Sequence, residues 1–393
     1  MKRFILLAAM LTACKWTDFD DLSDQTWVHA QDKPSIGSTD YAISITGASD
    51  GTDGGRLAVV STDSPTYSTI VYDAKGGSKI GDNPLKLGQH FITSLSEKPI
   101  LVSDDLGHVA LVEKAIDAGQ IAVVSGQADL PADLAFAGNA PTSAVWDGTN
   151  LLIAAPAPTA GAPNLFVVDG TSNMPSCALT DENGMPLQAA AIATSAGKLW
   201  VWSKSGSVMA YDQTALVAGC TTVPKATGAF TQAFTPGSGA RIHIVGDGTH
   251  EWAILAGASS DKTAPGEVVV LDLMQDPPAQ VGTTLTVDGL LSSTVAVLDT
   301  KTYVVLGIPS AQVGNTTSGE VAIHDFDPTN GTLGDMASEV LNDAQPENNQ
   351  LFGRDVTTMK FNGHTILVVA ASNEVFAYYR TSLYNTDTRI PPP

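Results

Sequence analysis

The C-terminal part of the chain carries a three-strand pattern that limits what the protein can fold into. Three short apolar runs between residues 351 and 379 are separated by turn residues. Asn362-Gly363 is a strong hairpin signal, because a two-residue type I′ turn needs a positive φ at both central positions. The sequence therefore predicts that 356–361 pairs with 365–369 as antiparallel strands, and that 374–379 follows as a third strand.

The third strand of this pattern recurs along the chain. Each copy has a small or turn residue followed by alternating apolar positions, and five copies end in Asp; they lie at 68–73, 107–112, 164–169, 206–212, 266–272, 319–325 and 373–379. A near-continuous apolar run precedes each copy, as expected for a strand buried on both faces. Each unit therefore has the order strand, turn, buried strand, loop and strand, with a more variable fourth strand before the next unit.

These repeats predict an all-β fold. A single four-stranded sheet of this kind cannot bury both of its faces, whereas several sheets stacked face to face around an axis can. Residues 26–390 are therefore predicted to form a seven-bladed β-propeller of four-stranded antiparallel blades. The alternative is a pair of β-sandwiches, which gives no reason for seven similar units.

The predicted ring needs a segment that completes its last blade. The final unit has only three strands, and a free edge strand invites mispairing. The segment 26–30 reads as a lone strand and is predicted to be the outer strand of the seventh blade. The competing candidate is 381–390, because the prolines at 391–393 cannot join a ladder.

Residues 1–13 have the features of an export signal. Lys2 and Arg3 precede an apolar run that is too short to span a bilayer. The segment 11–14, Leu-Thr-Ala-Cys, resembles the lipobox of bacterial lipoproteins. This resemblance implies a lipoprotein signal peptide that is cut before Cys14, with acylation of the Cys14 thiol and of the new amine. The alternative is an ordinary signal peptide with a chance cysteine.

Residues 14–25 are predicted to be a solvated acidic tether between the anchor and the folded body. Two or more acyl chains hold a protein firmly on a membrane, and Lys15 directly after the lipidated position favours sorting to the outer membrane. We therefore expect an outer-membrane lipoprotein that faces the periplasm or is displayed on the cell surface.

The net charge of −21, from 41 acidic and 20 basic residues, excludes several kinds of partner. Nucleic acid needs a basic surface, and so does electrostatic adsorption to anionic lipid. Contact with the membrane is therefore expected only through the N-terminal lipid anchor. The simplest role of the acidity is to keep an exported protein soluble.

A family resemblance rests on Phe352-Gly353, the Asn362-Gly363 turn and the strands at 367–370 and 375–378. In this order they resemble the FG-GAP repeat of integrin α-subunit propellers and their bacterial relatives. Further copies are similar but looser, at 303–321, 253–272 and 151–169. The resemblance covers roughly residues 39 to 380, and it implies a seven-bladed propeller used for interaction, usually without catalysis.

The FG-GAP resemblance also raises the question of calcium, because these blades often bind it in a turn rich in Asp and Asn. The nearest approach is the turn at 49–54, where Asp50 and Asp53 supply two carboxylates but one residue of the usual spacing is missing. Asp147 and Asp247 are explained more simply as hairpin residues that tolerate positive φ. No cofactor is therefore expected, with Asp50 and Asp53 as the calcium candidate.

The sequence points to no catalytic residue. Its seven histidines are scattered without metal-ligand spacing, and no nucleophile elbow, phosphate loop or dinucleotide-binding fingerprint occurs. His243 and His324 alternate with apolar neighbours, so at least one is expected to be a hydrogen-bonded strand histidine. The chain is predicted not to be an enzyme.

Two cysteines remain if Cys14 is lipidated. Cys177 and Cys220 each follow a third strand by several residues, in consecutive units, so both are expected in the outer regions of neighbouring blades. An exported protein meets an oxidising environment. A bridge and two independent thiols both stay open, because the sequence does not supply the Cα separation that a disulfide requires.

The favoured function is a non-enzymatic, lipid-anchored envelope or cell-surface protein whose propeller binds a protein or glycan partner. The connections at 159–164, 259–266 and 309–319 join second to third strands, so they are expected on one rim as the contact surface. One alternative is a periplasm-facing assembly scaffold, because 206–212 resembles the third strand of PQQ-like repeats in outer-membrane propellers; the Trp that closes such repeats is missing from most units. Another is a propeller lyase or hydrolase acting in the central channel.

Overall fold

The computed structural model describes separate strands ahead of residue 141 and nearly all positions from 141 to 380. The ranges described ahead of 141 are 27–29, 41–49, 55–63, 66–74, 86–87, 100–103, 109–112, 119–123 and 133–134. The positions left out after 141 are 148, 158, 169–175, 182, 219, 221–226, 232–233, 262, 299, 344–345, 362–363 and 373. The regular secondary structure of these described residues is almost entirely β-strand, with one helix, α3 (Gln213–Val217).

The described strands form six antiparallel sheets of four strands and one sheet of five strands, which we number I to VII in chain order. Sheet I contains β2 (Tyr41–Ser49), β3 (Gly55–Asp63), β4 (Thr66–Ala74) and β5 (Lys86–Leu87). Sheet II contains β6 (Ile100–Ser103), β7 (Val109–Val112), β8 (Gly119–Val123) and β9 (Asp133–Leu134). Sheet III contains β10 (Ser143–Trp146), β11 (Leu151–Ala154), β12 (Leu165–Val168) and β13 (Ser176–Cys177).

The remaining sheets follow the same order of strands. Sheet IV contains β14 (Ala189–Ser195), β15 (Lys198–Ser203), β16 (Ser207–Asp212) and β17 (Thr227–Thr231). Sheet V contains β18 (Arg241–Gly246), β19 (Glu251–Gly257), β20 (Gly266–Asp272) and β21 (Ala279–Val287). Sheet VI contains β22 (Ser292–Leu298), β23 (Lys301–Ile308), β26 (Glu320–Asp327), β27 (Thr332–Leu333) and β28 (Glu339–Leu341). Sheet VII contains β29 (Asp355–Phe361), β30 (His364–Ala370), β31 (Val375–Arg380) and β1 (Trp27–His29).

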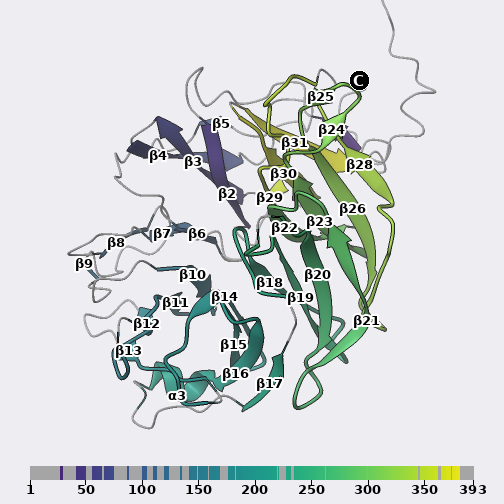
Figure 1. Ribbon diagram of the computed structural model, residues 1–393. Helices are drawn as coiled ribbons and strands as arrows, with labels where there is room; N and C mark the ends of the chain where they lie inside the picture. The colour runs from purple at the N-terminus through teal and green to yellow at the C-terminus, as the bar shows by residue number, and fades with distance from the viewer. Residues whose placement is uncertain are drawn as a thin grey trace, which may run out of the picture.

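The first strands of the seven sheets surround the middle of the molecule, and the later strands lie toward its periphery (Figure 1). Each first strand contacts the first strand of the next sheet in the order β2, β6, β10, β14, β18, β22 and β29, and β29 contacts β2. The arrangement of antiparallel four-stranded sheets is therefore propeller-like.

The core lies between consecutive sheets, because alternate residues of a strand point to opposite faces. Tyr303 and Val305 of β23 pack against sheet VII, whereas Val304 and Leu306 pack against sheet V. The second and third strands are therefore buried on both faces, as their near-continuous apolar runs predict. In sheet VII the predicted strands at 356–361, 365–369 and 374–379 correspond to β29, β30 and β31, within about one residue at each end.

The recurring Asp at the end of the third strand shapes the turn that follows. Asp212 accepts hydrogen bonds from the main-chain N–H groups of Thr214 and Ala215 and so caps α3. Asp272 accepts from the N–H of Met274 at 2.9 Å. A short side-chain acceptor of this kind satisfies the first donors of a turn or helix. Part of the acidic charge is therefore structural.

The Phe352-Gly353 pair fixes the path between sheets VI and VII. Phe352 is fully buried and makes an edge-to-face contact with Phe376, with ring centroids 5.1 Å apart. Gly353 has a φ of 84°, and a Cβ there would lie 2.5 Å from the carbonyl oxygen of Glu320. Only glycine permits both this backbone conformation and this close approach.

The N-terminal strand completes the last sheet. β1 pairs antiparallel with β31, placing Val28 opposite Tyr379. The sheet order is β1-β31-β30-β29, so β1 is the edge strand on the side away from the middle. This confirms the prediction that the segment around 26–30 supplies the outer strand of sheet VII. The competing segment 381–390 lies outside the described residues.

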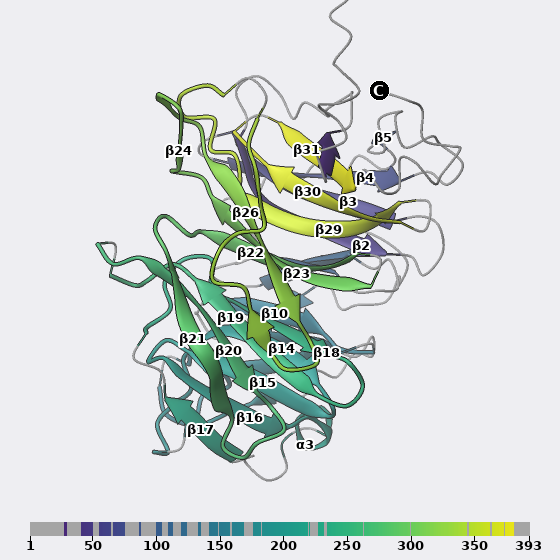
Figure 2. The ribbon, with the colours of Figure 1, turned by 90° about the vertical axis from the view of Figure 1, so that its right-hand side faces the viewer.

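Sheet VI differs from the predicted four-strand unit. Its connection between β23 and β26 contains a hairpin, β24 (Gln312–Val313) and β25 (Thr316–Thr317), at the left-hand face in Figure 2. Its outer position is shared by β27 and β28, which pair with opposite ends of β26. The sequence did not indicate either feature, because strands of two or three residues carry no measurable periodicity.

Candidate functional site

A buried carboxylate lies where the first strands meet. Asp355 begins β29 and is 3% exposed. Its Oδ2 accepts a hydrogen bond from Ile45 N of β2 at 2.8 Å, and its Oδ1 accepts from its neighbour Val356 N at 2.9 Å. Two positions further along β29, Thr357 Oγ1 accepts from Gly47 N at 3.1 Å. The bonds from Ile45 and Gly47 join the last sheet to the first, whose first strands are neighbours.

The opposite charge comes from Arg241 at the start of β18. Its Nη2 lies 2.5 Å from Asp355 Oδ1, and its Nη1 donates to the carbonyl oxygens of Ser293 at 2.7 Å and Val356 at 3.1 Å. One guanidinium group therefore links sheets V, VI and VII. The side chain of Asp355 is 4% exposed, whereas 32% of the Arg241 side chain is exposed.

His243 lies two residues after Arg241 on the same strand. Its Nε2 is 2.9 Å from Ser293 Oγ. Burial, followed by the positive charge of Arg241, lowers the pKa of His243 to about 3. The ring is therefore neutral at neutral pH. His324 is 4% exposed, and its Nδ1 lies 2.9 Å from the carbonyl oxygen of Gly334. The expectation of a hydrogen-bonded strand histidine is confirmed at both positions.

The Ser293–His243 pair has the separation of a nucleophile and its base but not their surroundings. Ser293 is fully buried, so no substrate can reach its hydroxyl group. The Asp355 carboxylate is paired with Arg241 rather than with the imidazole. A pKa near 3 also makes His243 a weak base at neutral pH. We interpret the pair as structural.

A cavity of about 350 Å³ lies beside this network. Its walls come from the first strands of sheets II to V and the residues just ahead of them: 100–101, 142–145, 191–193 and 240–243. Most of these residues are aliphatic, and the polar ones are Thr142, Ser143, Arg241 and His243. Thr142 Oγ1 donates to Ala189 O at 2.8 Å, and Ser143 Oγ accepts from Ile192 N at 3.1 Å.

The predicted lipid-attachment site and the calcium candidate are not placed by the structure. Cys14, the signal segment 1–13, the tether 14–25, and Asp50 with Asp53 lie outside the described residues. Within the described ranges, no group of His, Cys, Asp and Glu side chains could hold a metal ion. The same ranges contain no helix long and apolar enough to cross a membrane.

Asp147 and Asp247 lie in hairpin turns, as predicted, but neither of them has a positive φ. Asp147 Oδ1 accepts from Thr149 N at 2.8 Å, and Asp247 Oδ1 accepts from Thr249 N at 2.8 Å. Asp247 also accepts from the main chain of His250, and these main-chain bonds lower the pKa of Asp247 to about 2. The second carboxylate oxygen of each residue has side-chain partners: Asp147 Oδ2 accepts from Asn150 Nδ2 and from Gln213 Nε2 of sheet IV, and Asp247 Oδ2 lies 3.2 Å from His250 Nδ1.

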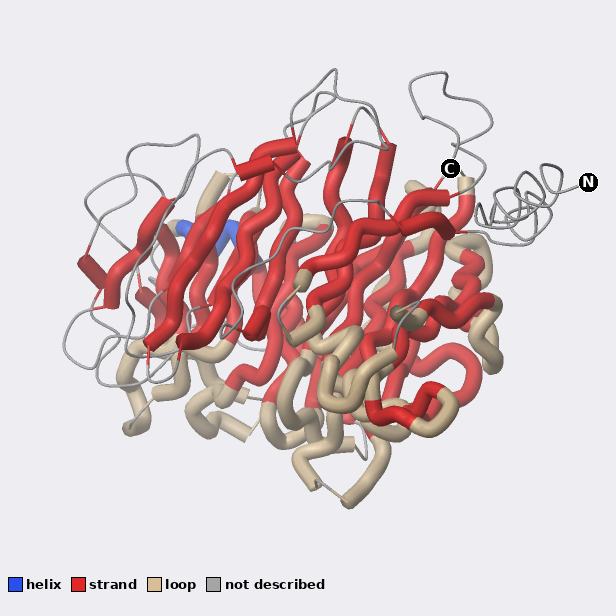
Figure 3. The backbone as a smooth tube through the Cα atoms, turned by 90° about the horizontal axis from the view of Figure 1, so that it is seen from above, coloured by secondary structure: helices blue, strands red, loops and turns tan. Residues whose placement is uncertain are grey.

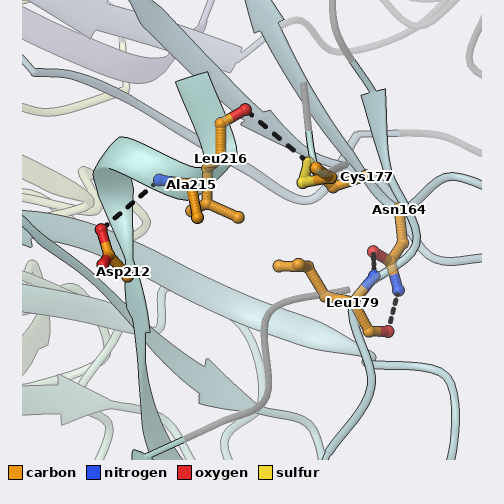
Figure 4. The surroundings of a disulfide bond; sticks show 7 residues. Asn164, Cys177, Leu179, Asp212, Ala215 and Leu216 are labelled. Atoms are coloured by element: carbon orange, nitrogen blue, oxygen red, sulfur yellow. Dashed lines mark hydrogen bonds between the residues drawn. A yellow bond between two sulfur atoms is a disulfide. The ribbon is translucent and has the colours of Figure 1, made fainter. Parts of the chain in front are cut away.

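A disulfide bond joins sheets III and IV. Cys177 of β13 is bonded to Cys220, which follows α3, with the Cα atoms 5.6 Å apart. The bond lies beside the α3 carbonyl of Leu216 and a buried Asn164 that holds the main chain of Leu179 (Figure 4). The question that the sequence left open is thus answered by a bridge between the outer regions of two consecutive sheets.

Among the described connections, most lie on one side of the sheets, below the strand ends in Figure 3. Ser260 N donates to Thr235 O at 3.0 Å, which ties the β19–β20 connection to the segment leading into β18. Asn349 N donates to Thr317 O at 2.9 Å, which ties the β24–β25 hairpin to the segment leading into β29. We call the connections 155–164, 258–265 and 309–319, with these leading segments, the rim.

Comparisons with known proteins do not show a family for this chain. No family model matches the chain, and no curated protein sequence matches it. The N-terminal domain of Nup159 is a structural neighbour at a TM-score of 0.47 and 9% identity, covering 90% of this chain and 95% of that chain. A chain of an S. cerevisiae complex of Dbp5 with Nup159, Gle1, IP6 and ADP gives the same values. A likeness at this level defines neither family nor function.

Sequence reasoning missed Arg241, Ser293 and Asp355. Each lies at or next to the start of a first strand, where an otherwise apolar pattern begins. A charged residue at that position in two units was the available signal. Neither charge could be recognised as half of an ion pair from the sequence, because Arg241 and Asp355 are 114 residues apart.

We predict that Asp355→Asn destabilises the protein by about 2–4 kcal/mol. The substitution leaves the Arg241 charge without its partner, and the amide cannot accept every bond that the carboxylate accepts. Urea unfolding followed by tryptophan fluorescence measures the change. The exposed Asp325→Asn in β26 is the matched control and should stay within about 0.5 kcal/mol of wild type. Equal stability of both variants would contradict this assignment.

We predict that His243 makes stability fall as the pH is lowered from 6.5 toward 3. In that window the unfolded chain binds a proton at this position and the folded protein does not. The slope is up to about 1.4 kcal/mol per pH unit, reduced where the ring faces the cavity. Stability measured from pH 7.5 to 4 should therefore be less pH-dependent in His243→Gln than in wild type. Parallel curves for the two proteins would refute the assignment.

We predict that loss of the Cys177–Cys220 bond lowers the free energy of unfolding by about 2–4 kcal/mol, because the bridge closes a loop spanning 43 residues. Thermal unfolding of Cys220→Ser, compared with wild type, measures this loss. A reducing agent should lower the midpoint of wild type toward that of the variant. The variant itself should not respond to the reductant, which serves as the control.

Proposed function

We propose that sheets I to VII are the blades of a closed seven-bladed β-propeller, and that the protein is a non-enzymatic interaction module. Three observations support the closed ring. The contacts between first strands run once around and return from β29 to β2. Asp355 hydrogen-bonds across that last junction. β1 supplies the outer strand of the final sheet, so the two ends of the chain share one blade.

The proposed binding surface is the rim, and its organisation is the observation that carries this proposal. Loops held on a rigid scaffold are where binding residues are usually found. Here the scaffold is a ring of buried strands, and main-chain hydrogen bonds tie two of the rim loops to the segments that lead into first strands. The β24–β25 hairpin extends this rim with exposed Gln312 and Asn315.

A protein partner fits the rim better than a glycan. The connections 155–164, 258–265 and 309–319 contain no aromatic residue on which a sugar ring could stack. The connection 155–164 is mostly Ala and Pro, and the other two carry Ser, Thr, Asn and Gln side chains that hydrogen-bond readily to another protein surface. This recognition role is the one that the FG-GAP resemblance implies.

We further propose that the protein is an outer-membrane lipoprotein anchored through Cys14. The support is the lipobox-like segment 11–14 together with the acidic segment that follows it. Anchoring would hold the rim close to an envelope surface. Display on the cell surface would favour the adhesion-like role, and a periplasmic orientation would favour the assembly-scaffold alternative.

We predict that opposite ends of sheet VI contribute unequally to partner binding. Gln312→Arg with Asn315→Arg places two charges on the rim hairpin, and Val297→Arg with Thr300→Arg places the same charges at the other end of the sheet. Recovery of cross-linked envelope partners should fall at least about tenfold for the first variant only, since each unpaired charge buried at an interface costs a few kcal/mol. Equal recovery with both variants would exclude the rim.

We predict that wild-type protein enters the detergent phase on Triton X-114 partitioning and that Cys14→Ser stays in the aqueous phase, because two or more acyl chains are needed for stable anchoring. Protease treatment of intact cells then distinguishes the two orientations. Loss of the folded body indicates surface display, and its survival indicates the periplasmic scaffold. Identical partitioning of the two proteins would refute the anchor without bearing on the rim.

A further inference from the structure

The cavity between sheets II and V has polar groups on two walls and an apolar wall between them. Arg241 and His243 of β18 line one side, and Thr142 and Ser143 line the other. β14 lies between these strands and contributes only Ala191, Ile192 and Ala193. Among the described residues that line the cavity, none is acidic.

Three groups on these walls keep hydrogen-bonding capacity that the described protein does not use. Ser143 Oγ accepts from Ile192 N, and its own hydroxyl proton has no acceptor among the described residues. His243 bonds Ser293 through one ring nitrogen, and its other nitrogen has no partner within the described part of the chain. About a third of the Arg241 side chain is exposed, although its terminal nitrogens contact Asp355 and two carbonyl groups.

The charge that faces the cavity is positive. Asp355 compensates Arg241, but its side chain is 4% exposed and lies on the buried side of the guanidinium group. Burial and then the positive charge of Arg241 lower the pKa of His243, so its ring is neutral and adds no negative charge to this wall. Exposed acidic residues among the described ones act on the cavity through solvent, where salt screens charges beyond about 8–10 Å.

We propose that this cavity binds a small organic anion, with a carboxylate or similar oxyanion head on a short aliphatic body. The head accepts hydrogen bonds from Arg241, Ser143 and the free ring nitrogen of His243, with Ser293 donating to the other nitrogen. The body packs against Ile100 and the aliphatic residues of β14. The volume of about 350 Å³ lies at the low end of ligand pockets and so restricts the ligand to a small molecule. This site is separate from the rim and does not depend on rim binding.

Three probes of similar size separate the charge of the ligand from its bulk: propionate, the isosteric neutral propionamide, and the cation n-propylamine. Isothermal titration with the folded, soluble protein should show saturable binding of propionate, at least tenfold tighter than propionamide, and no binding of n-propylamine. In parallel, NMR titration of the His243 ring should show a higher pKa with saturating propionate, because a bound anion stabilises the protonated imidazole.

A cavity-filling variant locates the binding. Ala144→Phe enlarges a cavity-lining side chain that also contacts the core between sheets II and III, leaves Arg241, His243 and Asp355 unchanged, and should abolish propionate binding in the folded variant. Ala160→Phe makes the same change at an exposed rim position and should bind propionate like wild type. The proposal is overturned if propionate fails to saturate the folded protein, if propionamide binds equally well, or if Ala144→Phe, shown to be folded by its unfolding transition, still binds.

Discussion

The arrangement of this protein depends on how the inner edges of its first strands are satisfied. A first strand has a strand neighbour on one side only, so half of its main-chain N–H and C=O groups point toward the middle. Leaving such groups buried without partners costs about 1–3 kcal/mol each. Side chains from neighbouring first strands supply partners, as in the bonds from Ile45 N to Asp355, Gly47 N to Thr357, Ile192 N to Ser143 and Arg241 to Ser293 O.

Two regions of the middle of the molecule satisfy this constraint differently: one is filled by hydrogen-bonded side chains, and the other leaves a cavity. Between sheets V and I, Asp355 and the terminal nitrogens of Arg241 bond to neighbouring strands, which makes this side structural, while the exposed third of the Arg241 side chain lines the cavity. Between sheets II and V, the walls are mostly aliphatic, and a cavity remains. Any small-molecule chemistry of the axis therefore belongs to the second region, while the rim offers a separate surface for larger partners.

Much of the fold could be predicted from the sequence, because whether a strand is buried on one face or on both can be read from a few consecutive residues. The apolar runs at 303–309 and 366–372 indicated strands buried on both faces, and β23 and β30 have that burial. The lone strand around 26–30 was predictable because the last unit lacked a strand. The β24–β25 hairpin and β28 were not predictable, since strands this short carry no period of their own; β24 is stabilised by pairing with β25, and β28 by pairing with β26.

The sequence alone determined the repeated strands, the turns made by Asp147 and Asp247, and the lipobox-like segment, because each depends on residues within a few positions of one another. Only the tertiary structure decided that Arg241 pairs with Asp355, that Cys177 is bonded to Cys220, and that an open cavity remains beside β14. Those features join residues of different sheets. Their distances follow from how whole sheets pack around the middle, and no local pattern of residues carries that information.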